Sequence, residues 1–231
     1  MSVLFQDREQ AGHELAKELA EILKKNQMSL TDSDNELVVL AIPRGGIILG
    51  DIVANHFKCN LDVIISRKIR SEFNEEFAVG AMMPDGSYFL NEGITRLFNI
   101  SQAYLEKEIE FQKKEIKRRL IEFRGDVTYH SKFDGKVVVL VDDGIATGST
   151  IIASAEWVKN NFNCKQLIVA VPVAPARDET VNKLANIADS VVILHMEEAF
   201  SAVGQFYRDF NQLSDETVKE IMMKHQLENR G

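Results

Sequence analysis

Two adjacent acidic residues follow a run of apolar residues in the stretch VVVLVDDGIATGST, residues 137 to 150. The residues after the acids are small or carry hydroxyl groups, apart from one isoleucine. Their two glycines allow the backbone to turn sharply and to approach a ligand closely. Thr147, Ser149 and Thr150 offer hydroxyl groups beside the free N–H groups of a new helix N-terminus. This arrangement predicts a cradle for a phosphate monoester.

Asp142 and Asp143 stand directly before this cradle. Carboxylates in that position can accept hydrogen bonds from neighbouring ribose hydroxyls, and they can neutralise a divalent metal or a developing cation. A loop that only caps a helix would not need two acids after a buried strand, because burying unpaired carboxylates is costly. The stretch therefore predicts a site for a sugar phosphate. The GxxxxGK[ST] motif of P-loops and a GxGxxG motif after the first strand do not occur.

Strands and helices that would position these residues alternate along the chain. Apolar runs typical of buried strands are followed by segments with helical spacing of apolar residues, and Asp7 is placed to cap the first helix. Such alternation predicts right-handed crossovers and an α/β fold in which helices cover both faces of a parallel sheet. The predicted strands span 36–43, 61–66, 136–142, 165–173 and 190–194. The predicted helices span 7–23, 47–57, 101–125, 148–157 and 177–188, with a last one from about 215.

Ligands bind at the carboxyl ends of the strands in sheets of this kind. The first predicted strand ends in PRGG, the second in SRK and the third in the DDGIATGST segment. The less regular segment 69–90 is interpreted as an arm or a hairpin. Lys117, Arg118 and Arg119 lie late in the long helix that follows, where they suit the helix dipole, and we interpret them as a solvated face.

Composition excludes several classes of function. The 231 residues include 45% hydrophobic and 27% charged residues, as expected for a globular chain without repeats. A net charge of -8 argues against binding to nucleic acid or to an anionic membrane. No apolar run approaches the ~18 residues that span a bilayer, so a cytoplasmic protein is expected. Cys59 and Cys164 form no CxxC motif and are interpreted as reduced structural thiols.

The stretch VVVLVDDGIATGST resembles the phosphoribosyl diphosphate (PRPP) signature of the type I phosphoribosyltransferases, a hydrophobic strand followed by two acids and a TGxT loop. AIPRGG resembles their pyrophosphate loop, and RK after the second strand resembles the basic pair that opens their mobile catalytic loop. Four further stretches resemble a subgroup of predicted prokaryotic phosphoribosyltransferases of unknown base specificity. They are LFQDREQAGHELA, RKIRSEFNEEFAVGA, VAVPVAP and FSAVGQFYRDFNQLSDETV. The resemblance covers nearly the whole chain.

This resemblance implies a single type I phosphoribosyltransferase domain over 1–231, with a Rossmann-like parallel sheet flanked by helices. A core of about 36–194 would carry a small hood formed by the terminal segments, about 1–35 and 195–231. Residues 69–90 would be a mobile arm. The family pattern also implies a cis peptide bond between Pro43 and Arg44. A homodimer is compatible with this interpretation, and neither nucleic acid nor a membrane is an expected partner.

The resemblance also assigns roles to individual residues. Asp142 and Asp143 would hold the ribose hydroxyls and, through them or through water, Mg²⁺. The 5′-phosphate would be bound by Ala146, Thr147, Gly148, Ser149 and Thr150. The diphosphate would be bound by Arg44, Gly45 and Gly46, joined by Arg67 and Lys68, which with the two aspartates form the expected catalytic group. Candidate base contacts are Val173, Ala174, Pro175, Phe200, Phe206 and Tyr207, although an aromatic ring more often serves core packing.

The implied reaction is Mg-dependent transfer of 5-phosphoribosyl from PRPP to a nitrogenous base, with release of diphosphate, in nucleotide salvage or synthesis. Ala146 stands where enzymes acting on 6-oxopurines commonly carry aspartate, and this disfavours hypoxanthine and guanine without naming the base. Two alternatives remain open. A PRPP-sensing or nucleotide-sensing regulatory protein would keep the cradle without base chemistry. A diphosphokinase related to PRPP synthesis would need an ATP site, and we find none in the sequence.

Overall fold

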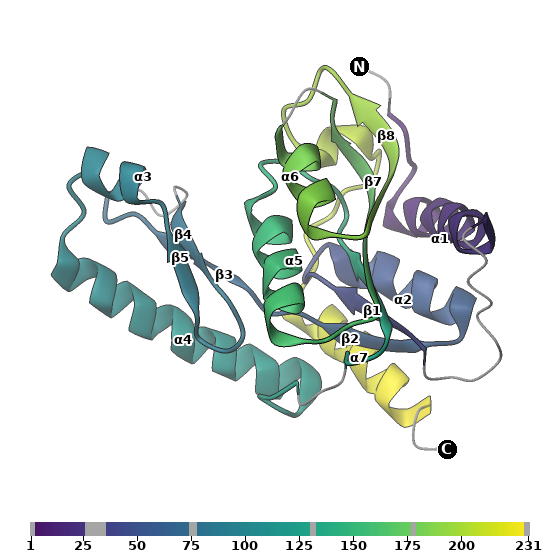
Figure 1. The fold of residues 1–231 in the computed structure, drawn as a ribbon, viewed down its shortest axis with the longest axis horizontal. Coiled ribbons are helices and arrows are strands. Elements are labelled where there is room, and N and C mark those ends of the chain that lie inside the picture. The colour runs from purple at the N-terminus through teal and green to yellow at the C-terminus, as the bar shows by residue number, and fades with distance from the viewer. Residues whose placement is uncertain (1–2, 26–35, 74–77, 130–132, 177–178, 229–231) are drawn as a thin grey trace.

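A parallel sheet of five strands forms the centre of the molecule (Figure 1). The computed structural model describes residues 3–25, 36–73, 78–129, 133–176 and 179–228. The strands lie in the order β2 (Asn60–Val63), β1 (Leu37–Ala41), β6 (Val137–Val141), β7 (Gln166–Pro175) and β8 (Ser190–Glu197). All four neighbouring pairs are parallel. The predicted α/β fold with a parallel sheet is therefore confirmed.

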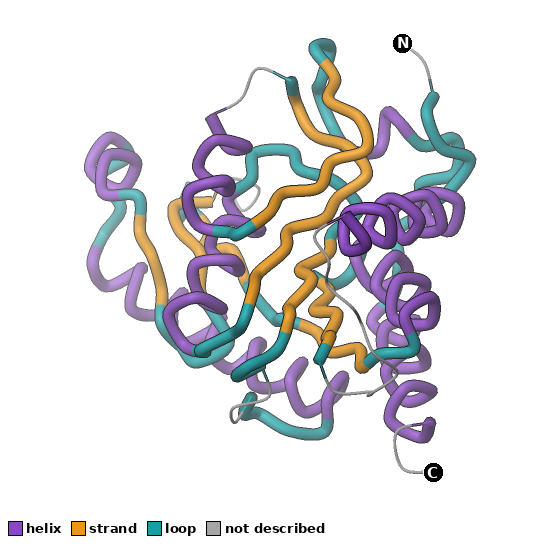
Figure 2. Tube along the Cα trace, turned by 45° about the vertical axis from the view of Figure 1, so that its right-hand side comes forward, coloured by secondary structure: helices purple, strands orange, loops and turns teal. Residues whose placement is uncertain are grey.

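Helices cover both faces of this sheet, as Figures 1 and 2 show. The helices α1 (Arg8–Lys25) and α2 (Gly46–Phe57) pack together on one face, and α5 (Ser149–Asn161) and α6 (Glu179–Ile187) pack on the other. The N–H of Gln10 donates to Oδ1 of Asp7 at 2.8 Å, so Asp7 caps the first helix as predicted. The predicted first residues of α6, 177–178, lie outside the described residues.

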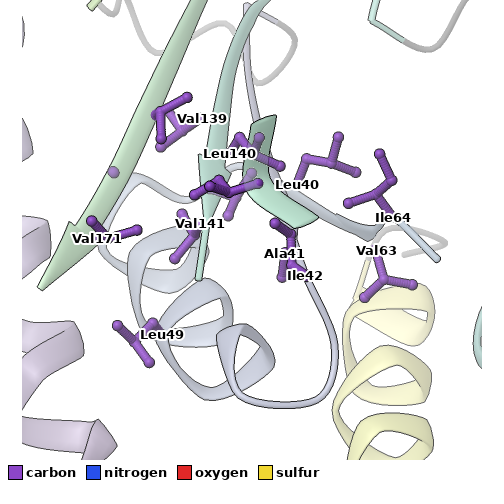
Figure 3. Packing of buried hydrophobic residues seen from close by; sticks show 14 of the residues in the cluster. Leu40, Ala41, Ile42, Leu49, Val63, Ile64, Val139, Leu140, Val141 and Val171 are labelled. Carbon is purple, nitrogen blue, oxygen red and sulfur yellow. The ribbon is translucent and has the colours of Figure 1, made fainter. Parts of the chain in front are cut away.

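The two central strands explain why the sequence shows continuous apolar runs rather than alternation. Every residue of β1 and of β6 is buried, because helices cover both sides of the sheet. Figure 3 shows Leu40, Val139 and Val141 packed in this core, with Leu49 reaching in from α2. Strands held in this way provide a rigid support for the loops at their carboxyl ends.

An arm projects to one side of the central sheet (Figure 1). It comprises an antiparallel sheet of β3 (Arg67–Arg70), β4 (Ala78–Met82) and β5 (Tyr88–Leu90), followed by α3 (Glu92–Leu97) and α4 (Gln102–Arg124). The hairpin of β4 and β5 lies within the segment predicted as an arm or hairpin, whereas β3 and α3 were not predicted. Residues 74–77 of that segment lie outside the described residues, and its mobility stays a prediction.

The two terminal segments meet beside the end of the sheet. The N–H groups of Leu4 and Phe5 donate to the carbonyl of Phe206 at 2.9 and 3.0 Å, next to the short helix η1 (Val203–Phe206). The last helix, α7 (Asp215–Glu228), instead packs against α4, β2 and α2. The division into core and hood remains a prediction. Within the described part of the chain, no helix is long and apolar enough to cross a membrane.

Candidate active site

The carboxyl ends of the adjacent strands β2, β1 and β6 bring the three unusual loops together. The Pro43–Arg44 peptide is cis, as predicted. A Cβ atom added to Gly45 would lie 1.9 Å from Oδ2 of Asp143, and one added to Gly46 would lie 2.6 Å from the carbonyl of Val141. No side chain fits in either place, so the two glycines let the PRGG loop rest directly on the segment that carries the acids.

The predicted phosphate cradle, residues 146–150, lies at the start of α5. Gly148 precedes the helix with φ 72°, a left-handed conformation that favours glycine, and no side chain caps the helix. Ala146, Thr147 and Ser149 are exposed, and the hydroxyl oxygens of Thr147 and Ser149 are 3.4 Å apart. The helix N-terminus therefore has no side-chain cap and is flanked by exposed hydroxyl groups, and an end of this kind favours a phosphate.

Asp143 is held by an arginine from the N-terminal helix. Nε of Arg8 donates to Oδ2 of Asp143 at 2.9 Å, and Nη1 of Arg8 donates to the carbonyl of Asn211 at 2.9 Å. The Arg8 guanidinium carbon also lies 3.8 Å from the centre of the Phe210 ring. The Tyr207 hydroxyl donates to the backbone carbonyl of Asp143 at 2.7 Å. Both terminal segments thus fix the position of this acid.

A cavity of about 340 Å³ opens beside the acid pair. It is lined by Arg8, Arg44, Gly45, Asp143 and residues 210–213. The lining residues therefore come from the start of α1, the PRGG loop, one of the two acids and the segment before α7. The lining carries the charges of two arginines and one aspartate beside the apolar side chains of Phe210 and Leu213.

Residues 6–210 match the family model described as the phosphoribosyl transferase domain. The chain belongs to the phosphoribosyltransferase family. It is 37% identical over 215 residues to two Mycobacterium tuberculosis proteins, "Putative phosphoribosyl transferase Rv0571c" (strain ATCC 25618 / H37Rv) and "Putative phosphoribosyl transferase MT0597" (strain CDC 1551 / Oshkosh). The aligned part covers 93% of this chain and 45% of each relative, so the chain spans about half the length of these curated relatives.

A crystal structure of similar fold covers almost the whole chain. The protein TT1426 from Thermus thermophilus is 35% identical to this phosphoribosyltransferase chain, with a TM-score of 0.72. The similarity covers 97% of this chain and 99% of that chain. The type I phosphoribosyltransferase-like α/β fold predicted from the sequence is confirmed.

The two basic residues after β2 have different environments in the phosphoribosyltransferase. Arg67 is half-buried, and its Nε donates to Oε1 of the buried Gln112 at 2.8 Å. Lys68 is exposed. Burial lowers the pKa of Arg67, and the positive charges of Arg119 and Arg70 lower it further. Arg67 therefore lies in an excess of positive charge, and α4 fixes its orientation through Gln112.

The interpretation of the basic run on α4 as a solvated face is wrong for one residue. The Arg119 side chain is only 16% exposed, and its Nη2 lies 3.5 Å from Oδ2 of Asp215. Arg118, next to it, is exposed and also lies 3.5 Å from the same oxygen. Arg119 is covered because the N-terminus of α7 packs over this part of α4 and brings Asp215 with it.

The candidate base contacts are mostly packed into the core. Four of the six are buried, and these are Val173, Ala174, Phe206 and Tyr207. Pro175 and Phe200 are half-buried, and the Phe200 ring lies 5.0 Å from that of Phe206. Their contact with a base stays a prediction. Sequence reasoning gave no role to Arg8, Phe210 or Asp215, and no local pattern around these residues indicates one.

Burial and mutual repulsion disfavour the ionised form of the acid pair. Burial raises the pKa of Asp142 well above its ordinary value, and the like charge of Asp143 raises it further. Burial also raises the pKa of Asp143, although the Arg8 guanidinium opposes that effect. A bound proton, a cation or hydroxyl donors would each relieve this pair, which is the environment that a ribose and a divalent metal could satisfy.

We expect Asp142→Asn to raise the free energy of unfolding at pH 7. Because the folded-state pKa of Asp142 lies above that of the unfolded chain, its ionisation destabilises the fold at pH values above the unfolded pKa of about 4. The gain should therefore disappear as the pH falls below about 4, where both states are protonated. Urea unfolding between pH 3.5 and 8 would measure it.

Asp189→Asn is the matched control for this pH dependence. Burial raises the pKa of Asp189, but hydrogen bonds from the Leu167 N–H and from Lys159 outweigh burial, so its pKa is lowered. Ionised Asp189 therefore stabilises the fold above its unfolded pKa, and its replacement should lower stability at pH 7. If both substitutions changed the free energy of unfolding at pH 7 in the same direction, the assignment of strain to Asp142 would be contradicted.

Proposed function

We propose that this chain transfers a 5-phosphoribosyl group from PRPP to a nitrogenous base and releases diphosphate. The observation that carries the proposal is the position of Asp142 and Asp143 between the PRGG loop and the open start of α5. PRPP carries its 5′-phosphate, its ribose and its diphosphate in this order. The phosphate would lie on the cradle, the ribose over the acids and the diphosphate at the PRGG loop. Family membership supports this interpretation.

Each part of the site would then act on a different part of the substrate. The cradle would bind the 5′-phosphate, and the two aspartates would accept hydrogen bonds from the ribose hydroxyls. Arg44 and Arg67 would stabilise the negative charge that develops on the departing diphosphate, which is where preorganised cations accelerate a reaction most. Arg8 would have to share or release Asp143 when the ribose binds, because it now occupies one oxygen of that carboxylate.

Mg²⁺ suits the oxygen donors of this site. No group of three or more His, Cys, Asp or Glu side chains within the described ranges could hold a metal by itself. The pair of Asp142 and Asp143 supplies carboxylate oxygens of the type that Mg²⁺ prefers, and Mg²⁺ usually completes its shell with water and substrate oxygens. When bound, the metal would spread the charge of the diphosphate.

The direct test is incubation of the protein with Mg-PRPP and a panel of nucleobases and small amines, with diphosphate release as the readout. A base that releases diphosphate supports the proposal and identifies the acceptor. Hypoxanthine and guanine are expected to be poor acceptors, because Ala146 replaces the aspartate that 6-oxopurine enzymes commonly carry. PRPP binding without release by any base would favour a PRPP-sensing protein instead.

We expect Mg-PRPP at ~100 times its dissociation constant to stabilise the protein by about 2.7 kcal/mol. For a chain of this size, that corresponds to roughly 5 to 10 °C in melting temperature. Asp142→Asn combined with Asp143→Asn should remove most of this shift without unfolding the protein, since the substitutions relieve repulsion between adjacent, half-buried like charges. Differential scanning calorimetry would measure both effects. An undiminished shift in the double variant, with Asp189→Asn as control, would contradict the role of the two acids.

A further inference from the structure

Three arginine side chains converge on the single carboxylate of Asp215 at the start of α7. Nη1 of Arg44 lies 3.5 Å from Oδ1 of Asp215, and Nη2 of Arg118 and of Arg119 each lie 3.5 Å from Oδ2. Hydrogen bonds between charged guanidinium and carboxylate groups are usually about 2.7 to 2.9 Å long. One carboxylate shared by three guanidinium groups therefore makes only long contacts with each of them.

We call the group of Arg44, Arg118, Arg119 and Asp215 the arginine cluster. Two polar atoms of this cluster have no hydrogen-bond partner within the described residues. They are Nε of Arg119 and Oδ1 of Asp215, and both are buried. A buried donor without an acceptor costs free energy, and more so when the group is charged. The members of the cluster thus do not fully satisfy one another, and Nε of Arg119 is a buried charged donor that an acceptor oxygen of an anion would satisfy.

The positive charges of the cluster are compensated unequally. Arg118 also pairs with Glu115 and with Glu122, so its charge is balanced from its own helix. Arg44 and Arg119 form no ion pair with another acid in the described part of the chain and share Asp215. Two guanidinium groups therefore depend on one carboxylate.

Arg67 adds a further positive charge at the edge of this cluster. Its pKa is lowered chiefly by burial and then by the charges of Arg119 and Arg70, while Glu115 and, less strongly, Asp215 oppose these effects. The whole chain carries a net charge of -8, so a local excess of arginine is not a property of the general surface. Such an excess in a partly buried place is typical of a site for a multiply charged anion.

Arg44 connects the cluster to the candidate active site. The same side chain lines the cavity beside Asp143 and contacts Asp215 through its guanidinium group. An anion bound at the PRGG loop would therefore compete directly with Asp215 for Arg44. Arginine also matches the geometry of phosphate oxygens, because its planar group can donate two parallel hydrogen bonds.

We propose that Asp215 is an internal substitute for a diphosphate-class anion, and that Arg44 and Arg119 exchange Asp215 for that anion when it binds. This inference rests on the proposed function, and it adds Arg119 of α4 and Asp215 of α7 to the diphosphate-binding site. The exchange frees Asp215, whose helix then loses its contact with the two arginines. Diphosphate binding is in this way coupled to the packing of α4 against α7.

Isothermal titration with inorganic diphosphate, in the absence of metal, tests the exchange. Asp215→Asn removes the competing carboxylate and should bind diphosphate ~5-fold more tightly than the unmodified protein. Arg119→Ala should bind it ~10-fold or more weakly, the scale of one lost charge-assisted hydrogen bond. Arg119→Lys keeps the charge and most of the packing and should show a smaller loss. Lys113→Ala, an exposed lysine on the same helix, is the matched control and should bind as the unmodified protein does.

Ribose 5-phosphate serves as a second probe, because it reports on the cradle and the acids. All these variants should bind ribose 5-phosphate with the same affinity as the unmodified protein. If Asp215→Asn binds diphosphate no more tightly, or if Arg119→Ala and Arg119→Lys bind it unchanged, the exchange is wrong while the proposed function stands. If Asp215→Asn weakens binding of Mg-diphosphate alone, Asp215 serves the metal and the exchange is again wrong. Failure of the unmodified protein to bind ribose 5-phosphate would instead count against the proposed function.

Discussion

Gly45→Ala should lower kcat/KM with PRPP by ~100-fold or more, equivalent to about 2.7 kcal/mol of transition-state stabilisation. The new methyl group would lie 1.9 Å from Oδ2 of Asp143, well inside van der Waals contact. Either the PRGG loop or the Asp143 side chain must move, and the latter is held by Arg8 at 2.9 Å. Both movements separate groups that would bind the ribose and the diphosphate, so the rate of diphosphate release measures the effect.

Gly50→Ala is the matched control, because it also adds one methyl group near the end of β1. There the methyl would lie 2.8 Å from Cβ of Ala41 and 3.0 Å from Cδ1 of Leu61, inside the core and away from the loops. Overpacking should lower the melting temperature of this variant while its affinity for PRPP stays close to that of the unmodified protein. Wild-type turnover by Gly45→Ala would show that the contact between the loop and Asp143 has no part in the reaction.

The sequence predicted the central sheet because burial on both faces leaves a strong local signal. All residues of β1 and β6 are buried, and both strands are continuous apolar runs. The strand β3 lacked that signal, since only Ile69 of its four residues is buried and the others are basic. Its pairing with β4, rather than its own composition, makes it a strand. The helix α3, with six residues, is too short to show a helical period.

The candidate site was predictable where its residues are neighbours in sequence. The acids and the cradle lie within one stretch of nine residues, 142–150, so residue type and order were enough to indicate them. Arg8 is 135 residues away from Asp143 and reaches it only through the packing of the first helix. Arg119 was misinterpreted for a related reason. Its helical position gave no sign that α7 would cover it, and only tertiary structure places Asp215 there.

Arg67→Ala should lower kcat by one to two orders of magnitude while weakening PRPP binding by at most ~10-fold. Arg67 is half-buried and oriented by Gln112, so its guanidinium group is preorganised for charge that develops on the diphosphate. An interaction that is stronger in the transition state than in the bound substrate raises turnover more than affinity. Steady-state kinetics with the accepting base, compared with PRPP affinity from calorimetry, would separate the two effects.

Lys68→Ala tests closure of the arm over the same site. Lys68 is exposed, and its side chain would gain a fixed contact with the diphosphate if the arm closed over the site. We expect a comparable loss of kcat in this variant. Proteolysis within the arm should be slower when Mg-PRPP and base are both bound than in the free protein, because a closed lid protects its backbone. Lys113→Ala, which changes an exposed lysine of α4, should leave kcat unchanged.

Arg67→Ala and Lys68→Ala also distinguish a transferase from a PRPP sensor. A sensor needs only to recognise the ground state of PRPP, for which the cradle and the aspartates supply most of the contacts. A transferase must in addition stabilise the leaving diphosphate, and we expect Arg67, which Gln112 orients, to contribute to that stabilisation. If both variants turn over like the unmodified protein, or if PRPP binds and no base releases diphosphate, the basic pair has no catalytic role and the sensor becomes the better account of the site.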